Sequence, residues 1–527
     1  MMKAISQFAM RLSAAAIVSI AALGAGTAAA ATPDDTLVVA MPSFYENTFL
    51  PWNGGGQRKF YLDAIYEYLV YLEPGTNRAM PGLAVSWSMS PDGKTWTYQL
   101  RPGVQFQGGY GELTAADVKF SLERTIDPKS ISGPASAMRK LIAKVEAPET
   151  YKVVVTLNNP DVDFTRGYLS NGLYTAIVSK KYFDAKGDDE ANAKPIGTGP
   201  YMLAESMRGV SIRLQAAQGA ATHWRVKPAF PNLLFVAVPE EATRVAKLMA
   251  GEADFAPINY DSIKTVKGAG MQVLSVRGNW VPVVRLGGLV TTSPKFHNPG
   301  VPWAKKEVRQ AMNHAINREE IVSAIFHGEA RPAAVDTPVA EWAKVAPYTY
   351  DPAKARQLLA AAGYPNGFDI TLKSFATTPG AELPQVADAV AMYWQAVGIR
   401  AKIQRVDFPS LRAAWTNGKA TDFAWTHRGL AFPNPLVAIE TSFTSKSVFA
   451  TYVTADTEAG YAELANTLDP AKRSALLEKM GTFLRDEAAG IFIAIANEPY
   501  GASGKVGKWE TINMNALGIE SITRAAK

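Results

Sequence analysis

Aromatic and polar side chains gather at three places along the chain where they could hold a small solute. Flat rings supply contact area at little entropic cost, and a few charged or polar groups fix the orientation of a ligand. The candidate ligand-binding residues are Phe44, Tyr45 and Asn47 in the first group, Trp280 and Arg285 in the second, and Trp425, His427, Arg428 and Phe432 in the third.

The third group gives the sharpest prediction. It follows Thr421 to Trp425, which has the composition of a strand, and ligands of α/β sheets bind beyond the carboxyl ends of strands. An arginine in that place favours a carboxylate or phosphate over an ammonium. We therefore expect the ligand to present an anionic or neutral polar group to Arg428. Two alternatives stay open: Trp425 could be a packed core side chain, and His427 and Arg428 could lie in a solvated loop.

The spacings that mark common enzyme sites are missing from the sequence. The five histidines form no His-Glu-x-x-His pattern, there is no cysteine, and no Gly-x-Ser-x-Gly elbow occurs. Gly197-x-Gly199 lacks the Lys-Ser/Thr of a phosphate-binding P-loop. We therefore predict no enzymatic activity, no cofactor and no resident metal, and a hydrolase is the least favoured interpretation. Contact of His427 with a metal that arrives as a chelate stays an alternative.

Helix and strand patterns alternate through the second half of the chain, which favours crossover units and a sheet covered by helices on both faces. The sequence therefore predicts an α/β fold. The expected strands span 35–40, 368–374, 400–406 and 421–425, a hairpin spans 87–100 around the turn 91–94, and the expected helices span 59–71, 305–326, 352–362, 383–397 and 408–417, with a further helix capped by Thr114.

Length and charge exclude some classes of function. The 527 residues suggest about two to four domains, and the apolar fraction of 47% is ordinary for a packed protein. The formal net charge of +6 is spread thinly, with only scattered pairs of basic residues. Nucleic acid is therefore not an expected partner.

The N-terminus has the order of a secretory signal. Lys3 and Arg11 precede an apolar run from Leu12 to Leu23, and small residues follow from Gly24 to Ala31. The run is shorter than the roughly 20 residues that a spanning helix needs. We predict a signal peptide over residues 1–31. Because no cysteine is present for lipid attachment, we expect an unanchored protein of the periplasm.

Several stretches together resemble the solute-binding proteins of ABC importers, in the dipeptide, oligopeptide and nickel class (family 5). No single stretch is specific, but all of them occur in the order that the family shows. They are 80–128 (MPGLAVSWSMSPDGKTWTYQLRPGVQFQGGYGELTAADVKFSLERTIDP), 195–203 (PIGTGPYML), 308–318 (VRQAMNHAINR), 350–368 (YDPAKARQLLAAAGYPNGF) and, more weakly, 251–255 (GEADF).

The resemblance implies two lobes that close over a ligand, with a subdomain inserted in the first lobe at about 80–193. Lobe I would span 32–285, lobe II 286–492, and residues 493–527 would return to lobe I. Crossings between the lobes are expected near Val284–Val290 and Phe492–Asn497. The resemblance also implies a monomeric carrier that delivers a peptide or peptide-like solute to a membrane permease with a cytoplasmic ATPase.

One departure from the family pattern affects the expected ligand. Peptide-binding members of the resembled family typically have an aspartate in the loop where Arg428 stands, and here no acid follows until Glu440. An arginine makes the electrostatic potential at this position positive, where an aspartate would make it negative. A non-peptide solute, such as an opine-like conjugate, an oligosaccharide or a metal chelate, therefore stays an alternative in the same transport role.

Overall fold

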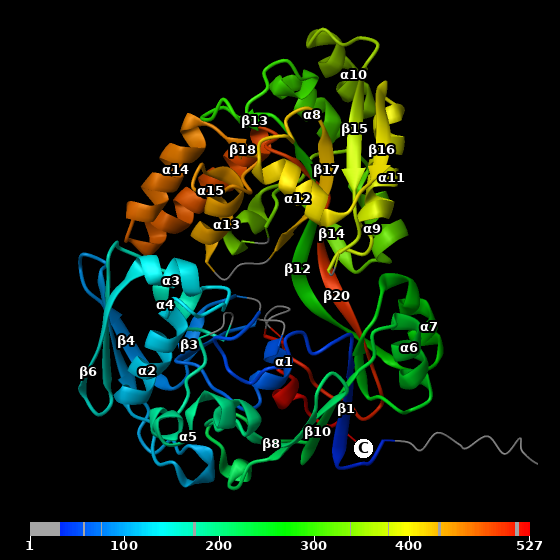
Figure 1. Cartoon of the computed structure of the whole chain (residues 1–527). Coiled ribbons are helices and arrows are strands. Elements are labelled where there is room, and N and C mark those ends of the chain that lie inside the picture. The colour runs from blue at the N-terminus through cyan, green and yellow to red at the C-terminus, as the bar shows by residue number, and fades with distance from the viewer. Residues whose placement is uncertain are drawn as a thin grey trace, which may run out of the picture.

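The computed structural model describes residues 32–526 apart from 56–57, 75, 172–174, 338, 378, 431–433 and 512–515. The predicted signal peptide, residues 1–31, lies outside the described residues, and so does Phe432. Within the described ranges, no helix is long and apolar enough to cross a membrane. Figure 1 confirms the expected α/β fold with two lobes, which are joined by the long strands β12 (Gln272–Leu286) and β20 (Ala494–Ala502).

One mixed sheet of twelve described strands runs through both lobes, in the order β16-β15-β17-β12-β20-β11-β1-β10-β9-β8, with β14 and β19 paired beside this path. The two joining strands lie at its centre. The other strands are β1 (Thr36–Met41), β8 (Tyr201–Met207), β9 (Ser211–Ala216), β10 (Asn232–Ala237), β11 (Phe255–Pro257), β14 (Ala330–Pro332), β15 (Phe368–Ser374), β16 (Ile399–Arg405), β17 (Ala424–Leu430) and β19 (Ile491–Phe492).

The antiparallel pair β12–β20 changes partners as it passes from one lobe to the other. Its first part pairs Gln272 with Ala502, beside β11 of lobe I, and its second part pairs with β17 of lobe II. The register shifts between Val276 and Trp280, where the chain bulges around Gly278 at φ 56°. A bulge bends its strand and increases the local twist. Both lobes are therefore connected through one bent, hydrogen-bonded ribbon.

Lobe II covers its part of the sheet with helices on both sides, as the alternating pattern predicts. Its core includes fully buried Trp394, Trp303 and Leu372. Asp351 caps α10 by accepting a hydrogen bond from the Lys354 amide at 2.8 Å, as expected from the Asp-Pro start. The helices are α8 (Lys306–His314), α9 (Arg318–Phe326), α10 (Pro352–Ala361), α11 (Leu383–Gln395), α12 (Phe408–Thr416), α13 (Pro435–Phe443), α14 (Ala455–Asn466) and α15 (Pro470–Asp486), and β13 (Leu289–Val290) pairs with β18 (Tyr452–Val453).

Lobe I carries a separate four-stranded antiparallel sheet in the order β4-β5-β7-β6, with its own buried cluster of apolar side chains. The expected hairpin is present, and Thr114 and Asp117 form a capping box at the start of α2. The elements here are β2 (Val70–Leu72), β3 (Ala79–Pro81), β4 (Ala84–Met89), β5 (Thr95–Leu100), α2 (Ala115–Ile126), α3 (Ala135–Leu141), β6 (Ile142–Glu149), β7 (Lys152–Leu157), α4 (Phe164–Tyr168) and α5 (Lys180–Ala193), and elsewhere in lobe I lie α1 (Lys59–Leu62), α6 (Glu241–Met249) and α7 (Ile263–Gly268).

The expected helix over 59–71 is wrong beyond its first turn, because α1 ends at Leu62. The carbonyls of Ala64 and Ile65 accept hydrogen bonds from the amides of Tyr201 and Gly199, each at 2.9 Å, instead of from later residues of a helix. A Cβ at Gly197 would lie 1.8 Å from the Ile65 carbonyl oxygen. The glycines of the GTGPY stretch therefore serve a close approach of two backbones rather than a left-handed conformation.

Two other boundaries differ from expectation. The helix expected over 305–326 is broken into α8 and α9 by Asn317, whose side chain caps α9 by accepting from the Glu320 amide. Residues Trp425 to Arg428 lie inside β17 and not in a loop after it, because β17 is extended to Leu430 by its pairing with β12. The sequence pattern predicts a strand that ends at Trp425, because residues 426–430 pair as a strand only with the distant segment β12.

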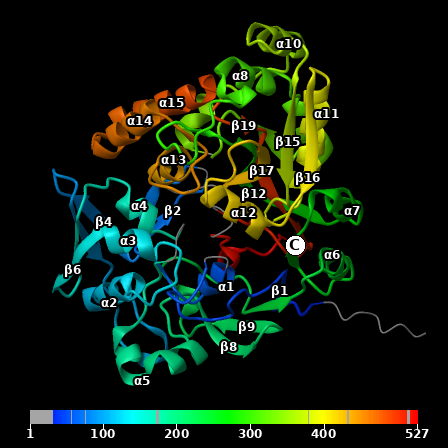
Figure 2. The ribbon, with the colours of Figure 1, turned by 45° about the horizontal axis from the view of Figure 1, so that its top comes forward.

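The part of lobe I that carries the four-stranded sheet meets lobe II through a buried ion pair. A guanidinium nitrogen of Arg473 in α15 contacts a carboxylate oxygen of Asp163, and their side chains are only 7% and 8% exposed. Figure 1 and Figure 2 show α14 and α15 on the side of lobe II that faces α3 and α4. Arg166 pairs with the second oxygen of Asp163 at 2.5 Å. Two arginines thus neutralise this carboxylate at the contact between the lobes.

We predict that Arg473→Met opens the protein. The substitution keeps an apolar stem but leaves Asp163 with one arginine, which should disfavour the contact by about 3 kcal/mol. Small-angle X-ray scattering of the ligand-free variant should give a larger radius of gyration. Lys344→Met, which removes an exposed pair with Glu478 within lobe II, is the control. Identical scattering of Arg473→Met and the unmodified protein would contradict the prediction.

Candidate ligand-binding site

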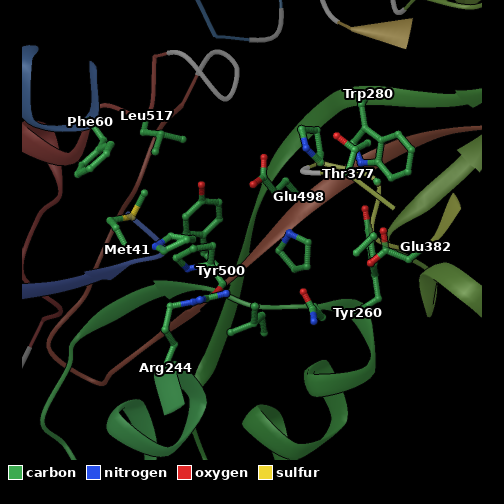
Figure 3. A pocket seen from close by; sticks show the side chains of 18 of the residues that line it. Met41, Phe60, Arg244, Tyr260, Trp280, Thr377, Glu382, Glu498, Tyr500 and Leu517 are labelled. Carbon is green, nitrogen blue, oxygen red and sulfur yellow. The ribbon is translucent and has the colours of Figure 1, made fainter. Parts of the chain in front are cut away.

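A cavity of about 200 Å³ lies between the lobes, beside the crossing of β12 and β20. Both lobes and the joining strands contribute to its wall, and Figure 3 shows Glu498 between Met41 and Phe60 on one side and Trp280 and Glu382 on the other. The lining residues are Met41, Pro42, Tyr45, Phe60, Pro239, Arg244, Pro257, Ile258, Asn259, Tyr260, Trp280, Thr377, Pro379, Gly380, Ala381, Glu382, Glu498, Pro499, Tyr500 and Leu517.

Aromatic side chains held by other rings form much of the wall. Trp280 is only 1% exposed and meets Phe326 edge to face, with the ring centroids 5.9 Å apart. Tyr260 contacts the same ring at 5.1 Å, and its hydroxyl donates to the Asn497 carbonyl. Tyr500 stacks on Phe255 at 5.1 Å. These rings are fixed before any ligand arrives, so they lose little entropy on binding.

Glu498 is the carboxylate of β20 in this wall. Its Oε2 atom accepts a hydrogen bond from Nδ2 of buried Asn279 at 2.7 Å. Burial is the main reason that its pKa is raised, the positive charge of Arg428 opposes the shift and the nearby Glu382 carboxylate adds to it, and together they bring the pKa to about 7. The pKa of Glu382 is raised as well, by burial and by Asp261. This part of the cavity therefore holds two carboxylates that are poorly solvated.

Arg244 also lines the cavity, but its hydrogen-bonding capacity is used within the protein. Its Nε atom donates to the carbonyl of Pro257 at 3.1 Å. Its Nη1 atom donates to the carbonyls of Val238 and Pro239, at 2.9 and 2.8 Å. The guanidinium thus links two segments of lobe I through three carbonyls and leaves little capacity for an anionic ligand.

Three of the residues predicted from the sequence lie at the cavity. Tyr45 and Trp280 line it directly. Tyr45 adopts φ 54° and is 46% exposed, so its ring stands at the open side. Arg428 lies at the margin, where its Nη1 atom donates to the carbonyl of Pro379 at 2.8 Å and its charge acts on Glu498 and Tyr45.

Other predicted residues lie elsewhere in the described structure. Trp425 is 1% exposed and packs against Trp415 at 5.2 Å in lobe II. Buried Arg285 pairs with Asp336 at 2.9 Å. Phe44 is buried against Phe60, and Asn47 sits in a left-handed turn after it at φ 47°. None of these side chains lines the cavity formed by the described residues.

His427 occupies an aromatic pocket of lobe II. Its ring lies 5.1 Å from Trp415 and 5.9 Å from Phe375, and its Nδ1 atom contacts the Arg428 carbonyl at 2.8 Å. Burial, together with the positive charge of Arg285, lowers its pKa to about 3. The ring is therefore neutral near pH 7. No group of three or more acidic or histidine side chains in the described ranges could hold a metal.

Sequence reasoning missed Glu498, Glu382, Tyr260 and Tyr500. One signal was available: Glu498-Pro499-Tyr500 interrupts an otherwise apolar strand, IFIAIAN, at the expected return to lobe I. An acid and an aromatic residue in a crossing segment are candidates for contact with a ligand held between lobes. No local pattern marked Tyr260 or Glu382, which come to the cavity from separate helical segments.

Comparison with known proteins places this geometry in a family. The sequence profile of the bacterial extracellular solute-binding proteins, family 5 (middle region), matches residues 78–450. Heme-binding protein A of Haemophilus influenzae is 28% identical over 388 residues, covering 69% of each chain. Di/tripeptide-binding protein 3 of Pseudomonas aeruginosa is 31% identical over 393 residues, covering 69% of this chain and 70% of the relative. The structure of HbpA2 from Haemophilus parasuis superposes with a TM-score of 0.77 at 23% identity, covering 93% of this chain and all of that one.

The environment of His427 predicts a pH dependence of stability. Its pKa in the folded protein, about 3, lies below the usual value near 6.5, so the unfolded state binds more protons between these values. The neutral ring contributes stability that is present above pH 6.5 and is lost as the pH falls toward 3. We predict that His427→Phe, which retains an aromatic ring, loses less stability than the unmodified protein between pH 7 and pH 4.

Urea unfolding at a series of pH values measures this difference, which should reach a few kcal/mol at pH 4. His297→Phe is the control, because the ring of His297 lies outside this aromatic pocket and contacts the Gly288 carbonyl at 3.1 Å. Parallel pH profiles of His427→Phe and the unmodified protein would show that the buried imidazole does not cause the dependence.

Proposed function

Because the chain belongs to the bacterial extracellular solute-binding proteins of family 5, we propose that it captures a peptide or peptide-like solute between its lobes and delivers it to an ABC importer. The observation that carries the proposal is the cavity lined by both lobes and by the joining strands. The transport partners would be membrane permease subunits with a cytoplasmic ATPase. The protein would act as a monomer in the periplasm after removal of residues 1–31.

The family consists of solute-binding proteins rather than enzymes. In keeping with this, the proposed role is stoichiometric: one solute is bound, carried and released, with no bond made or broken. Fixed aromatic walls and a small number of charges suit selective binding. The names of the relatives mention both di- and tripeptides and heme, so family membership leaves the solute open.

We propose that the lobes part at the bulge of β12, over Arg277–Asn279, and at Asn497 of β20. At these positions β20 exchanges β11 of lobe I for β14 of lobe II, and β12 begins its pairing with β17 of lobe II. The β12 crossing then lies some residues before the segment Val284–Val290 that the sequence suggested. Residues with irregular pairing can absorb changes in backbone angle when two lobes close. The four-stranded sheet of β4 to β7 supports an inserted subdomain within the range 80–193.

A non-peptide solute is the second candidate, and Arg428 is the observation that favours it. Its guanidinium lies at the cavity margin and keeps donors beyond the one bound to Pro379. An anionic group of the solute would be drawn to it. Opine-like conjugates and acidic sugars carry such groups, and so does the C-terminus of a peptide. The proposed contact with Arg428 therefore fits both candidates.

The identity of the solute can be tested directly. We predict that native mass spectrometry of the protein purified from its own host's periplasm finds one bound solute per chain. A thermal-shift screen with peptides, sugars and organic acids should then show a higher melting temperature with that class, because a ligand that binds only the folded state stabilises it. A protein that binds none of these and instead turns over a solute would contradict the carrier role.

The role of Arg428 can be tested by calorimetry with the solute so identified. We predict that Arg428→Ala lowers its affinity about tenfold or more, because a charge-assisted hydrogen bond is lost. Arg356→Ala is the matched control, since Arg356 is exposed on α10 and contacts the Ala396 carbonyl far from the cavity. An affinity for Arg428→Ala equal to that of the control would remove Arg428 from the site.

A further inference from the structure

We propose that Glu498 is a specificity-determining residue that binds a cationic group, an ammonium or other protonated nitrogen, of the solute in the cavity. This inference rests on the proposed function, because it concerns the same cavity. Combined with an anionic group at Arg428, it makes the solute dipolar, with opposite charges a short distance apart. Amino acids, peptides and amino-sugar acids have this character.

The position of Glu498 is fixed by the bent ribbon that joins the lobes. The preceding residue, Asn497, accepts a hydrogen bond from the Gly278 amide at 3.0 Å and donates through its own amide to the Glu329 carbonyl at 2.9 Å. Asn279 then holds one oxygen of the Glu498 carboxylate. A carboxylate positioned in this way needs no rearrangement to receive a ligand, which favours binding.

The second oxygen of Glu498 has no hydrogen-bond partner among the described residues. Asn279 makes the one hydrogen bond that the carboxylate accepts, and no arginine or lysine of the described chain forms an ion pair with it. The positive charge of Arg428 lowers the pKa of Glu498, but the Nη1 atom of that guanidinium donates its hydrogen bond to the Pro379 carbonyl. A carboxylate oxygen of a partly buried side chain at a cavity gains most from a charged donor, so an ammonium is the group that this atom favours.

The charges and rings around Glu498 also favour a cation. Glu382 adds a second carboxylate to the same cavity, whereas Arg244 is engaged by backbone carbonyls. Aromatic faces attract cations, most strongly where water is excluded. The titratable and charged groups that face Glu498 from the surrounding elements are Arg428 in β17, Glu382 before α11, Tyr45 after β1, Tyr260 before α7 and Tyr500 in β20 itself.

Binding of a cation should be linked to a proton. Without a solute, burial raises the pKa of Glu498 to about 7 against the opposing charge of Arg428, with a smaller contribution from Glu382, so part of the population carries a proton there near pH 7. A cation beside the carboxylate would lower this pKa, and the proton would leave on binding. The affinity for a cationic solute should therefore fall as the pH drops below 7.

The test uses the dipeptide dialanine and its N-acetylated form, which differ in one positive charge. We predict that the unmodified protein binds dialanine and that Glu498→Gln binds it about ten- to a hundredfold more weakly. N-acetyl-dialanine should bind both proteins equally weakly. Glu205→Gln is the matched control, because Glu205 is exposed on β8 and its loss changes the net charge by the same amount.

A second measurement does not depend on any variant. Calorimetry of dialanine binding at pH 7, in phosphate and in Tris buffer, should give heats that differ in proportion to the buffers' ionisation enthalpies, as proton release requires. Equal heats in the two buffers, or equal affinity of Glu498→Gln and the unmodified protein for dialanine, would overturn the inference while leaving the proposed function intact.

A failure of the proposed peptide-carrier function can be distinguished from a failure of the inference about Glu498. If dialanine and longer peptides do not bind the unmodified protein, the peptide assignment is wrong, and the solute recovered by native mass spectrometry decides about Glu498. A recovered solute with a protonated nitrogen, bound more weakly by Glu498→Gln, supports the inference. A recovered solute without any basic nitrogen overturns it.

Discussion

The antiparallel pairing of β12 with β20 is the constraint on which the rest of the structure depends. These two strands carry the sheet from lobe I to lobe II, and each lobe adds its own strands to their outer edges. The backbone must change direction between the lobes while its amides and carbonyls stay paired, and a bulge at Gly278 together with the side chain of Asn497 meets both demands. The cavity lies beside this bend. Its central residues, Trp280 and Glu498, are therefore placed by the same hydrogen bonds that join the lobes.

Polar and apolar burial have different roles around this ribbon. One large apolar cluster extends from lobe II into lobe I and a second lies within lobe I, and burial of such surface is the dominant favourable contribution to folding. Arg285 and Arg244 are buried charges inside the lobes that have partners: Arg285 pairs with Asp336, and Arg244 binds three backbone carbonyls. Glu498 and Glu382 differ from them, because no cation of the described chain forms an ion pair with either. Both side chains are partly buried, and a poorly solvated carboxylate without an ion-pair partner is typical of a place that binds something else.

The contacts between the lobes include two regions whose chemistry differs. At the cavity, the lobes face each other across aromatic rings and carboxylates that form no ion pair within the described chain. Beside the four-stranded sheet of lobe I, they meet through Asp163 and Arg473, a closed and neutralised pair. The contact between Asp163 and Arg473 is neutralised without a solute. The cavity, in contrast, contains carboxylates that a positively charged group of a solute would neutralise. This division suits a protein that must close over a ligand and yet open again.

The sequence by itself determined the fold class, the family resemblance and several local elements. The Asp-Pro start of α10, the capping box of α2 and the hairpin of β4 and β5 depend on neighbouring residues only, so local patterns were sufficient. The tertiary structure decided where a segment's hydrogen bonds go when a distant backbone supplies them. The helix expected over 59–71 ends at Leu62 because the carbonyls of residues 64 and 65 accept hydrogen bonds from the amides of residues 201 and 199. Strand β17 includes Arg428 because it pairs with β12. The tertiary structure also decided which residues form the site. Tyr45, Trp280 and Arg428 reach the cavity and Trp425 does not, while Glu498 is the acid at its centre. These residues meet only through the packing of elements that lie far apart in the sequence.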